Sequence, residues 1–235
     1  MSRLSALFGT ALVAATLAAA IPASAARHHA TPIPADTPQH RAGSLSPPGC
    51  ILGVQGSPGL LVDLFPGDDA YFTLLRPSIC GACSLTTLAN VHIWLEFRNA
   101  CTAPVSITCV KVGGTTCPFP DLAHPLFVSV DTALVGDAGI NEFIVPVPSN
   151  WKLLDNAFLC VRFTAADSNC NLNTNAPRLV ERVGCVRCES YGYGAGMLSD
   201  TCDGAGAPLL SAEISECVLT PARPRSWGSL KILYR

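Results

Sequence analysis

The feature that most constrains this chain is its set of twelve cysteines, all of which lie at or after residue 50 of 235. An even number of cysteines behind an export signal predicts a framework of disulfides, because thiols oxidise outside the cytoplasm. We therefore expect the cysteines to stabilise the fold, in pairings that spacing alone does not reveal. The disulfide candidates are Cys50, Cys80, Cys83, Cys101, Cys109, Cys117, Cys160, Cys170, Cys185, Cys188, Cys202 and Cys217.

Residues 1–25 have the pattern of a signal peptide. Arg3 precedes an apolar run, and Ala23, Ser24 and Ala25 form a cleavage site of the A-x-A type. The run ends at a proline without a charged flank, which does not fit a membrane anchor, and no later run is long enough to span a bilayer. We expect a secreted or extracytoplasmic protein without a transmembrane segment, located in the periplasm or at the cell surface.

The rest of the chain divides into three regions. Residues 26–49 are rich in proline and poor in apolar side chains, which predicts a disordered linker. Residues 50–217 hold the cysteines and nearly all strand-like runs, and predict the folded domain. Residues 218–235 form a basic tail, in which Ser226 is placed to cap a short amphipathic helix. Without residues 1–25 the chain has 14 basic and 17 acidic side chains, a net charge near −3 that argues against a nucleic-acid partner. The charge is uneven, with −7 in residues 26–217 and +4 in the tail.

Within the cysteine-rich region, apolar residues recur with the period of a β-strand. Val91, Ile93, Leu95 and Phe97 alternate with polar or amphipathic residues, as in a strand that buries one face. Gly- and Pro-containing turns separate several similar short runs. This pattern predicts an all-β fold, a jelly-roll-like two-sheet β-sandwich stabilised by disulfides, with the short C-terminal helix beside it. The other expected strands are 60–64, 70–75, 105–112, 126–130, 143–147, 157–163, 178–183 and 209–214.

Two Cys-x-x-Cys motifs raise an alternative to disulfides. Cys80 with Cys83, and Cys185 with Cys188, have the spacing of zinc knuckles or of a thiol-redox pair. The motifs lie about a hundred residues apart, well beyond the usual ribbon spacing, and no βαβ pattern surrounds either one. We favour the disulfide framework, with structural zinc or thiol redox chemistry as the alternative.

Two loops carry oxygen ligands of the kind that calcium prefers. Asp167, Asn169 and Asn171 alternate in one loop, and Asp137, Asn141 and Glu142 cluster in another. Neither loop has the glycine and glutamate positions of an EF-hand, and the same residues are common in ordinary turns. No cofactor is expected, and structural calcium or zinc remains the minor alternative.

No motif assigns a catalytic residue. Gly56-Ser57-Pro58-Gly59 lacks the pattern of a nucleophile elbow. A glycan-directed hydrolase would need two facing carboxylates, for which the available acids are Glu96, Glu142, Asp155 and Glu181. Any exported domain supplies as many acids, so hydrolysis remains an alternative function.

Aromatic side chains provide the candidates for ligand binding. Planar rings stack on pyranose faces, and neighbouring polar groups then orient the sugar. Each candidate also has an ordinary structural role, as a core, edge or loop residue. The candidate ligand-binding residues are His92, Trp94, Glu96, Trp151, Tyr191 and Tyr193.

Three segments together resemble a known set of sequences. They are Phe72 to Cys83, the strand Val91 to Phe97 with Cys101 and Pro104 after it, and the ending Ser226 to Arg235. They are similar to exported, cysteine-rich bacterial proteins of no established function. The resemblance implies a secreted bacterial sandwich and carries over no catalytic residue. With no catalytic motif in the chain, we expect a secreted, non-catalytic binding or surface-associated module of unknown ligand, for which an extracellular glycan or a cell-surface component is the candidate partner.

Overall fold

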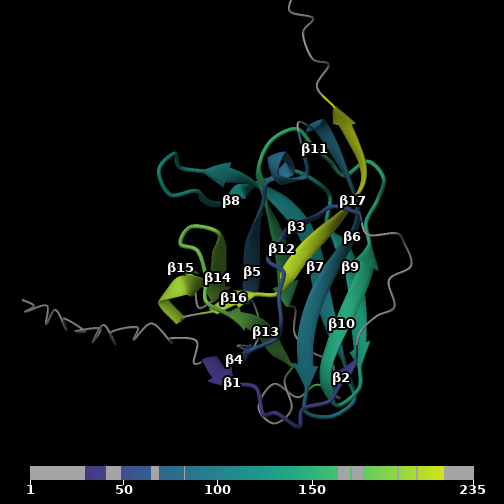
Figure 1. Cartoon of the computed structure of the whole chain (residues 1–235), viewed down its shortest axis with the longest axis vertical. Coiled ribbons are helices and arrows are strands. Elements are labelled where there is room, and N and C mark those ends of the chain that lie inside the picture. The colour runs from purple at the N-terminus through teal and green to yellow at the C-terminus, as the bar shows by residue number, and fades with distance from the viewer. Residues whose placement is uncertain are drawn as a thin grey trace, which may run out of the picture.

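The computed structural model describes residues 30–40, 49–64, 69–81, 83–163, 170, 177–194, 196–204 and 206–219. Within these ranges the chain forms two β-sheets and two short 3₁₀ helices (Figure 1). The expected all-β, two-sheet architecture with disulfides is confirmed, whereas the jelly-roll connectivity remains a prediction. The last strand runs through Leu219, so the expected C-terminal helix falls outside the described residues.

The first sheet, called sheet A, contains the longest strand of the described chain, β6 (Cys83–Phe97). On one side β6 pairs with β10 (Gly139–Pro146) and β11 (Lys152–Leu153). β10 pairs in turn with β2 (Gln39–His40). On its other side β6 pairs with β17 (Leu210–Leu219) and β13 (Arg178–Val183). The remaining strands of sheet A are β1 (Ala30–Pro32), β3 (Ile51–Gly53), β4 (Leu60–Asp63) and β16 (Gly206–Pro208).

The second sheet, called sheet B, is antiparallel and centres on β12 (Ala157–Phe163). Its strands follow the order β15 (Met197–Asp200), β14 (Ser190–Gly194), β5 (Ala70–Leu75), β12, β7 (Cys101–Gly113) and β8 (Phe119–Pro125). The strand β9 (Val130–Gly136) also pairs with β7. The helix η1 (Pro77–Cys80) follows β5, and η2 (Thr201–Gly204) follows β15.

The main hydrophobic core lies between the two sheets. Val91, Ile93, Leu95 and Phe97 of β6 are fully buried there, as their alternation predicts. Sheet B contributes the inward-facing residues of β7 and β12 to the same cluster. A side chain of this size contributes about 1.5 to 3 kcal/mol when it is fully buried, so this core is the main source of stability.

A smaller apolar cluster covers the outer face of each sheet. On sheet B it contains Phe72, Phe158 and Tyr191, and on sheet A it contains Leu61 and Val180. These residues alternate along their strands with residues of the main core. The sandwich therefore buries side chains between its sheets and also on the outer face of each sheet. This explains why several strands have nearly continuous apolar sequences.

The segment expected to be a disordered linker contains two strands. β1 pairs with β4 at one edge of sheet A, and β2 pairs in parallel with β10 at the opposite edge. We call residues 30–40 the N-terminal strap, because they connect these two edges across the lower end of the molecule in Figure 1. Ile33 packs against the outer apolar cluster of sheet A, and the Ile140 N–H donates to the carbonyl of Pro38 at 2.7 Å.

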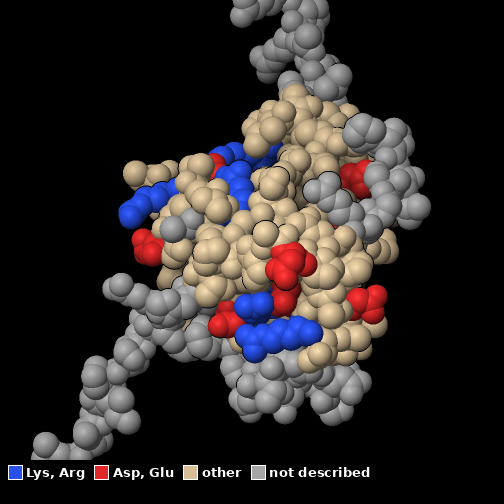
Figure 2. Space-filling model, turned by 60° about the horizontal axis from the view of Figure 1, so that its bottom comes forward, with Lys and Arg blue, Asp and Glu red and all other residues tan. Residues whose placement is uncertain are grey.

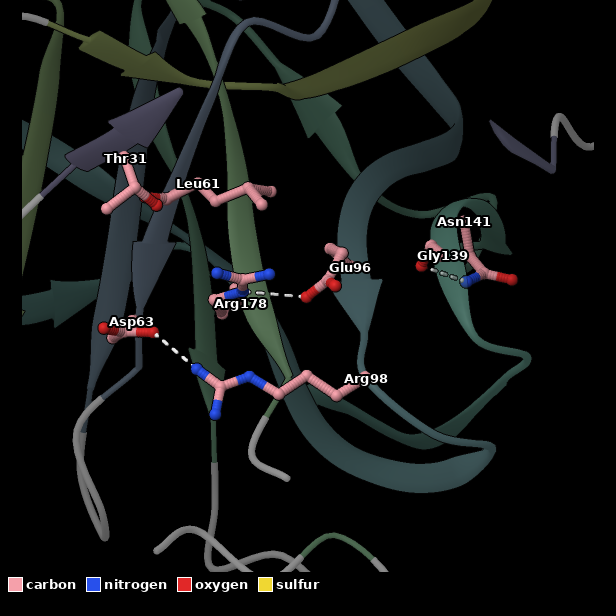
Figure 3. A network of polar contacts seen from close by, with 8 residues as sticks. All are labelled: Thr31, Leu61, Asp63, Glu96, Arg98, Gly139, Asn141 and Arg178. Atoms are coloured by element: carbon pink, nitrogen blue, oxygen red, sulfur yellow. Dashed lines mark hydrogen bonds and ion pairs between the residues drawn. The ribbon is translucent and has the colours of Figure 1, made fainter. Parts of the chain in front are cut away.

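A polar network occupies the same lower end of sheet A (Figure 3). Arg178 Nε donates to Glu96 Oε2 at 2.9 Å, and Arg98 Nη2 lies 3.6 Å from Asp63 Oδ1. Figure 2, which brings this end forward, shows basic and acidic groups side by side on the surface. Opposite charges here pair with each other, so this end offers no concentrated charge to a partner.

Five disulfides crosslink the structure. They are Cys50–Cys80, Cys83–Cys217, Cys101–Cys170, Cys117–Cys188 and Cys185–Cys202. Cys109 and Cys160 remain buried thiols on neighbouring strands. In the register of β7 and β12, Cys109 lies opposite Leu159 and Cys160 lies opposite Thr108. The two thiols therefore point to opposite faces of sheet B and cannot bond to each other.

Candidate functional site

A groove of about 700 Å³ lies at the end of the sandwich where β6 begins and β7 ends. Its walls come from η1, from Cys83, from Lys111 and Val112 of β7, and from the ranges 126–127 and 152–156. This end is uppermost in Figure 1, near the label of β11 and the end of β17. The groove thus joins segments from both sheets, and its volume falls in the usual range for ligand sites.

Two disulfides fix the rim of this groove. Pro77 presets the backbone at the start of η1, and Cys80 at its end is bonded to Cys50 beside β3. Cys83, which also lines the groove, is bonded to Cys217 near the end of β17. Arg76, just before η1, pairs with Glu189. The rim is therefore held in place before any ligand arrives.

An aromatic side chain forms part of the groove wall. Phe127 lines the groove and is half-buried, and its ring stacks on Trp151 with 5.0 Å between centroids and 15° between planes. Trp151 itself is only 1% exposed and belongs to the main core. The sequence analysis placed Trp151 among the ligand-binding candidates. In the structure its ring is buried and supports the ring of Phe127, a residue that lines the groove.

The groove also carries polar side chains of several kinds. Lys111 approaches from sheet B, and Lys152 of β11 approaches from sheet A. Ser78, Asp155 and Asn156 complete the polar part of the lining. The groove lining thus combines two lysines, a serine, an asparagine and one aspartate with the aromatic residue Phe127. Such a mixture suits a polar ligand that also has an apolar face.

The comparisons with known proteins leave this groove to be interpreted from its own chemistry. No protein-family model matches the chain, and no curated protein matches it. One similar solved structure contains the cysteine protease and lectin-like domains of Cwp84, a surface layer associated protein of Clostridium difficile. The likeness has 12% sequence identity and a TM-score of 0.46, and covers 66% of this chain but 33% of that chain. A likeness at this level supports no inference about function.

Three of the residues predicted for ligand binding lie together, but away from the groove. His92, Trp94 and Glu96 share the outer face of β6, as their alternation with core residues predicts. His92 Nδ1 lies 3.1 Å from Glu142 Oε1, and Glu96 is held by Arg178. Trp94 packs against the outer apolar cluster of sheet A. Each of the three side chains thus already contacts a neighbouring residue of sheet A, and together they form part of the outer surface of that sheet.

The tyrosines predicted as a stacking platform lie on the outer face of sheet B. Tyr191 is 6% exposed, packs edge-on against Phe158, and donates its hydroxyl to the Pro118 carbonyl at 2.8 Å. Tyr193 packs half-buried against the same cluster. The four predicted aromatic residues, Trp94, Trp151, Tyr191 and Tyr193, therefore lie in three separate places and do not form one binding surface.

The two Cys-x-x-Cys motifs do not converge. Cys80 and Cys83 are bonded to Cys50 and Cys217, and Cys185 and Cys188 are bonded to Cys202 and Cys117. The two cysteines of each motif therefore belong to different disulfides. None of the four has a free thiolate to bind zinc, and neither motif forms the internal disulfide of a thiol-redox pair. Among the residues that the structure describes, no three His, Cys, Asp or Glu side chains are placed to hold a metal ion.

The two calcium hypotheses have different outcomes. Asp167, Asn169 and Asn171 lie outside the described residues. In the second loop, Asn141 Nδ2 donates to the carbonyls of Asp137 and Gly139, at 2.8 and 2.9 Å. Glu142 points instead to His92. Asn141 therefore closes the turn between β9 and β10, which is the structural role that such residues ordinarily have.

The acids considered for hydrolysis are dispersed. Glu96 and Glu142 lie on the outer face of sheet A, Asp155 lines the groove, and Glu181 is 3% exposed beside Gly206. Burial raises the pKa of Glu181 to about 7. Burial also raises the pKa of the Cys160 thiol to about 12, so this free thiol is a poor nucleophile.

Sequence reasoning did not identify Phe127 and Lys111 as site residues. They come from positions separated in the chain, and only the pairing of β7, β8 and β12 brings them to the same end of sheet B. One signal was available in the sequence. The chain has only three lysines, Lys111, Lys152 and Lys231, and the two that belong to the folded domain both line the groove.

Proposed function

We propose that this protein is an extracellular, non-catalytic module that binds a glycan in the groove. Five disulfides support a location outside the reducing cytoplasm. Among the described residues, none form a helix with the length and apolar character needed to span a bilayer. The signal peptide expected at residues 1–25 is consistent with export, followed by action in the periplasm or at the cell surface.

The observation that carries the proposal is an aromatic residue in the groove lining, Phe127, whose ring stacks on Trp151. A pyranose presents an apolar face to an aromatic ring, and its hydroxyls then need polar partners at the edge of the ring. Ser78 and Asn156 line the same groove and supply a hydroxyl and an amide. Stacking on Trp151 fixes the orientation of Phe127, so little conformational entropy is lost when a sugar binds.

The dispersion of the carboxylates favours binding without hydrolysis. Two-carboxylate hydrolysis places the acid and its partner about 5 to 10 Å apart across the bond that breaks. Of the acids considered, only Asp155 lines the groove, and Glu181 lies in the core. The groove in the described part of the chain therefore has one member of such a pair, and hydrolysis becomes the less favoured function.

A glycan array probed with the purified, disulfide-intact protein tests this function. We expect selective binding, which Phe127→Leu weakens about tenfold because the apolar contact persists while the planar ring is lost. Phe119→Leu is the matched control, since Phe119 is an exposed aromatic of β8 that does not line the groove. Binding to no glycan, or equal losses in the two variants, would overturn the proposal.

A further inference from the structure

We infer that the glycan is acidic, and that Lys111 and Lys152 together hold its carboxylate or sulfate groups. This inference rests on the proposed function and names the class of glycan. Lys111 belongs to β7 of sheet B and Lys152 to β11 of sheet A, so each sheet supplies one cation to the same groove. Both side chains are exposed to solvent and accessible to a ligand.

The charge of the groove differs from that of the chain around it. Residues 26–217 have a net charge of −7, which repels anions from most of the surface. The groove contains two lysines and one carboxylate, Asp155, so its lining is net positive. Elsewhere, the described basic residues are arginines, and several are paired with acids, as Arg178 is with Glu96 and Arg76 with Glu189.

Lys111 keeps its charge available although an acid lies nearby. Asp121 of β8 lies opposite Lys111 in the strand register. Its carboxylate instead accepts from His124 Nδ1 at 2.7 Å and from the Ala123 N–H at 3.2 Å. No residue in the described ranges forms an ion pair with Lys111. Asp121 therefore stabilises the end of β8. The ammonium group of Lys111 remains available to a ligand.

Lys152 is placed by its neighbours in β11. Leu153 is buried in the main core and anchors the strand, and the backbone of this short strand pairs with Thr86 and Thr87 of β6. Lys152 is exposed beside it and forms no ion pair with any acid that the structure describes. Two cations without an ion-pair partner among the described residues thus line the same groove as Phe127, which suits a sugar that carries an acidic group.

The same groove favours a sugar over an acidic polypeptide. Lysines alone attract both, because an exposed ammonium recognises charge without much geometry. Phe127, Ser78 and Asn156 add a flat apolar face with hydrogen-bonding groups beside it, which matches a pyranose ring.

Binding to matched pairs of oligosaccharides tests the inference. The probes are oligogalacturonate, hyaluronan oligosaccharide and chondroitin sulfate oligosaccharide, the first also as its methyl ester, which keeps the skeleton and removes the charge. Poly-glutamate is the acidic probe without sugar. The protein variants are Lys111→Gln and Lys152→Gln, with Arg187→Gln as the control, because Arg187 is 80% exposed and pairs with Asp203 away from the groove.

We expect at least one acidic oligosaccharide to bind, and each lysine variant to weaken its binding about tenfold, the usual order for a charge-assisted hydrogen bond. The methyl ester and poly-glutamate should bind much more weakly, and Arg187→Gln should leave the affinity unchanged. Equal affinity for the ester, equal losses in all three variants, or equal binding of poly-glutamate would overturn the inference. If neutral glycans bind through Phe127 while the lysine variants have no effect, the proposed function stands and its acidic ligand does not. If no glycan binds, both fail.

Discussion

At the groove end of the sandwich, disulfides restrain the points where β6 begins and β17 ends, whereas the opposite end of sheet A depends mainly on weaker contacts. Cys83–Cys217 and Cys50–Cys80 surround the groove. The lower end has the N-terminal strap, the exposed Arg98–Asp63 pair and the mostly buried Arg178–Glu96 pair. A disulfide at this end, Cys101–Cys170, joins β7 to residue 170. Two of the five disulfides thus restrain the surroundings of the candidate binding site, as expected where a preformed surface improves affinity.

Removing the disulfide at the groove rim should have the largest effect. Cys83–Cys217 joins residues 134 apart in sequence, and closing a long loop restricts the unfolded chain strongly. We expect Cys83→Ser with Cys217→Ser to lower the free energy of unfolding by about 4 kcal/mol, measured by denaturant titration without reductant. The groove should lose glycan affinity at denaturant concentrations where the variant is still folded.

The matched control for this variant is the shortest disulfide loop in the described structure. Cys185–Cys202 has a sequence separation of 17, so the same double serine replacement should cost less, about 3 kcal/mol, and spare the groove. An equal loss of glycan affinity in both double variants would show that the groove does not depend on the nearby disulfide.

Glu181 should give the next largest effect, and its sign depends on pH. Burial raises its pKa from 4.5 to about 7 in the folded protein. As pH rises through this interval the unfolded chain loses the proton first, so the folded state loses stability, on the order of 3 kcal/mol in total. Glu181→Gln removes this loss. The free energy of unfolding of the variant, relative to that of the parent protein, should therefore be higher at pH 8 than at pH 4.

Denaturant titrations of the parent and the variant at pH 4, 6 and 8 measure this dependence. Glu216→Gln, at an exposed position of β17, controls for the loss of one carboxylate. A difference in stability between Glu181→Gln and the parent that stays constant with pH would contradict the assignment of a raised pKa to Glu181.

The strand pattern was predictable, whereas the groove was not. The alternation of Val91, Ile93 and Leu95 is a local property, because successive strand residues face opposite sides. The site depends on which strands pair, so Lys111 and Phe127 meet Lys152 only in the folded topology. Trp151 shows the same limit, since its sequence neighbours do not reveal that it stacks behind Phe127.

The cysteines show a similar division between local pattern and topology. Their number and compartment predicted disulfides, and ten of the twelve are paired. Spacing did not reveal that Cys80 and Cys83 bond to different distant cysteines. It also did not reveal that Cys109 and Cys160 face away from each other, because that depends on the register of β7 and β12.

The N-terminal strap should give a smaller effect that is confined to the lower end. Ile33 is its apolar anchor in the outer cluster of sheet A and is half-buried. We expect Ile33→Ser to lower the free energy of unfolding by about 1 kcal/mol and to release the strap locally. Hydrogen exchange at the Ile140 amide, which donates to Pro38, measures this release. Unchanged protection of that amide would show that the strap is held without Ile33.

The smallest effect is expected from the exposed ion pair at the same end. Arg98 and Asp63 lie 3.6 Å apart, and their side chains are 47% and 62% exposed, so water and salt screen their attraction. Asp63→Asn should change the free energy of unfolding by less than about 0.5 kcal/mol, and less still at high salt. Glu96→Gln is the comparison, because Glu96 is 8% exposed and its loss leaves a half-buried Arg178 without its carboxylate, which should cost about 2 kcal/mol. Equal losses of unfolding free energy in the two variants would show that burial does not set the strength of these contacts. The exposed Arg98–Asp63 pair would then stabilise the lower end as much as the Arg178–Glu96 pair does.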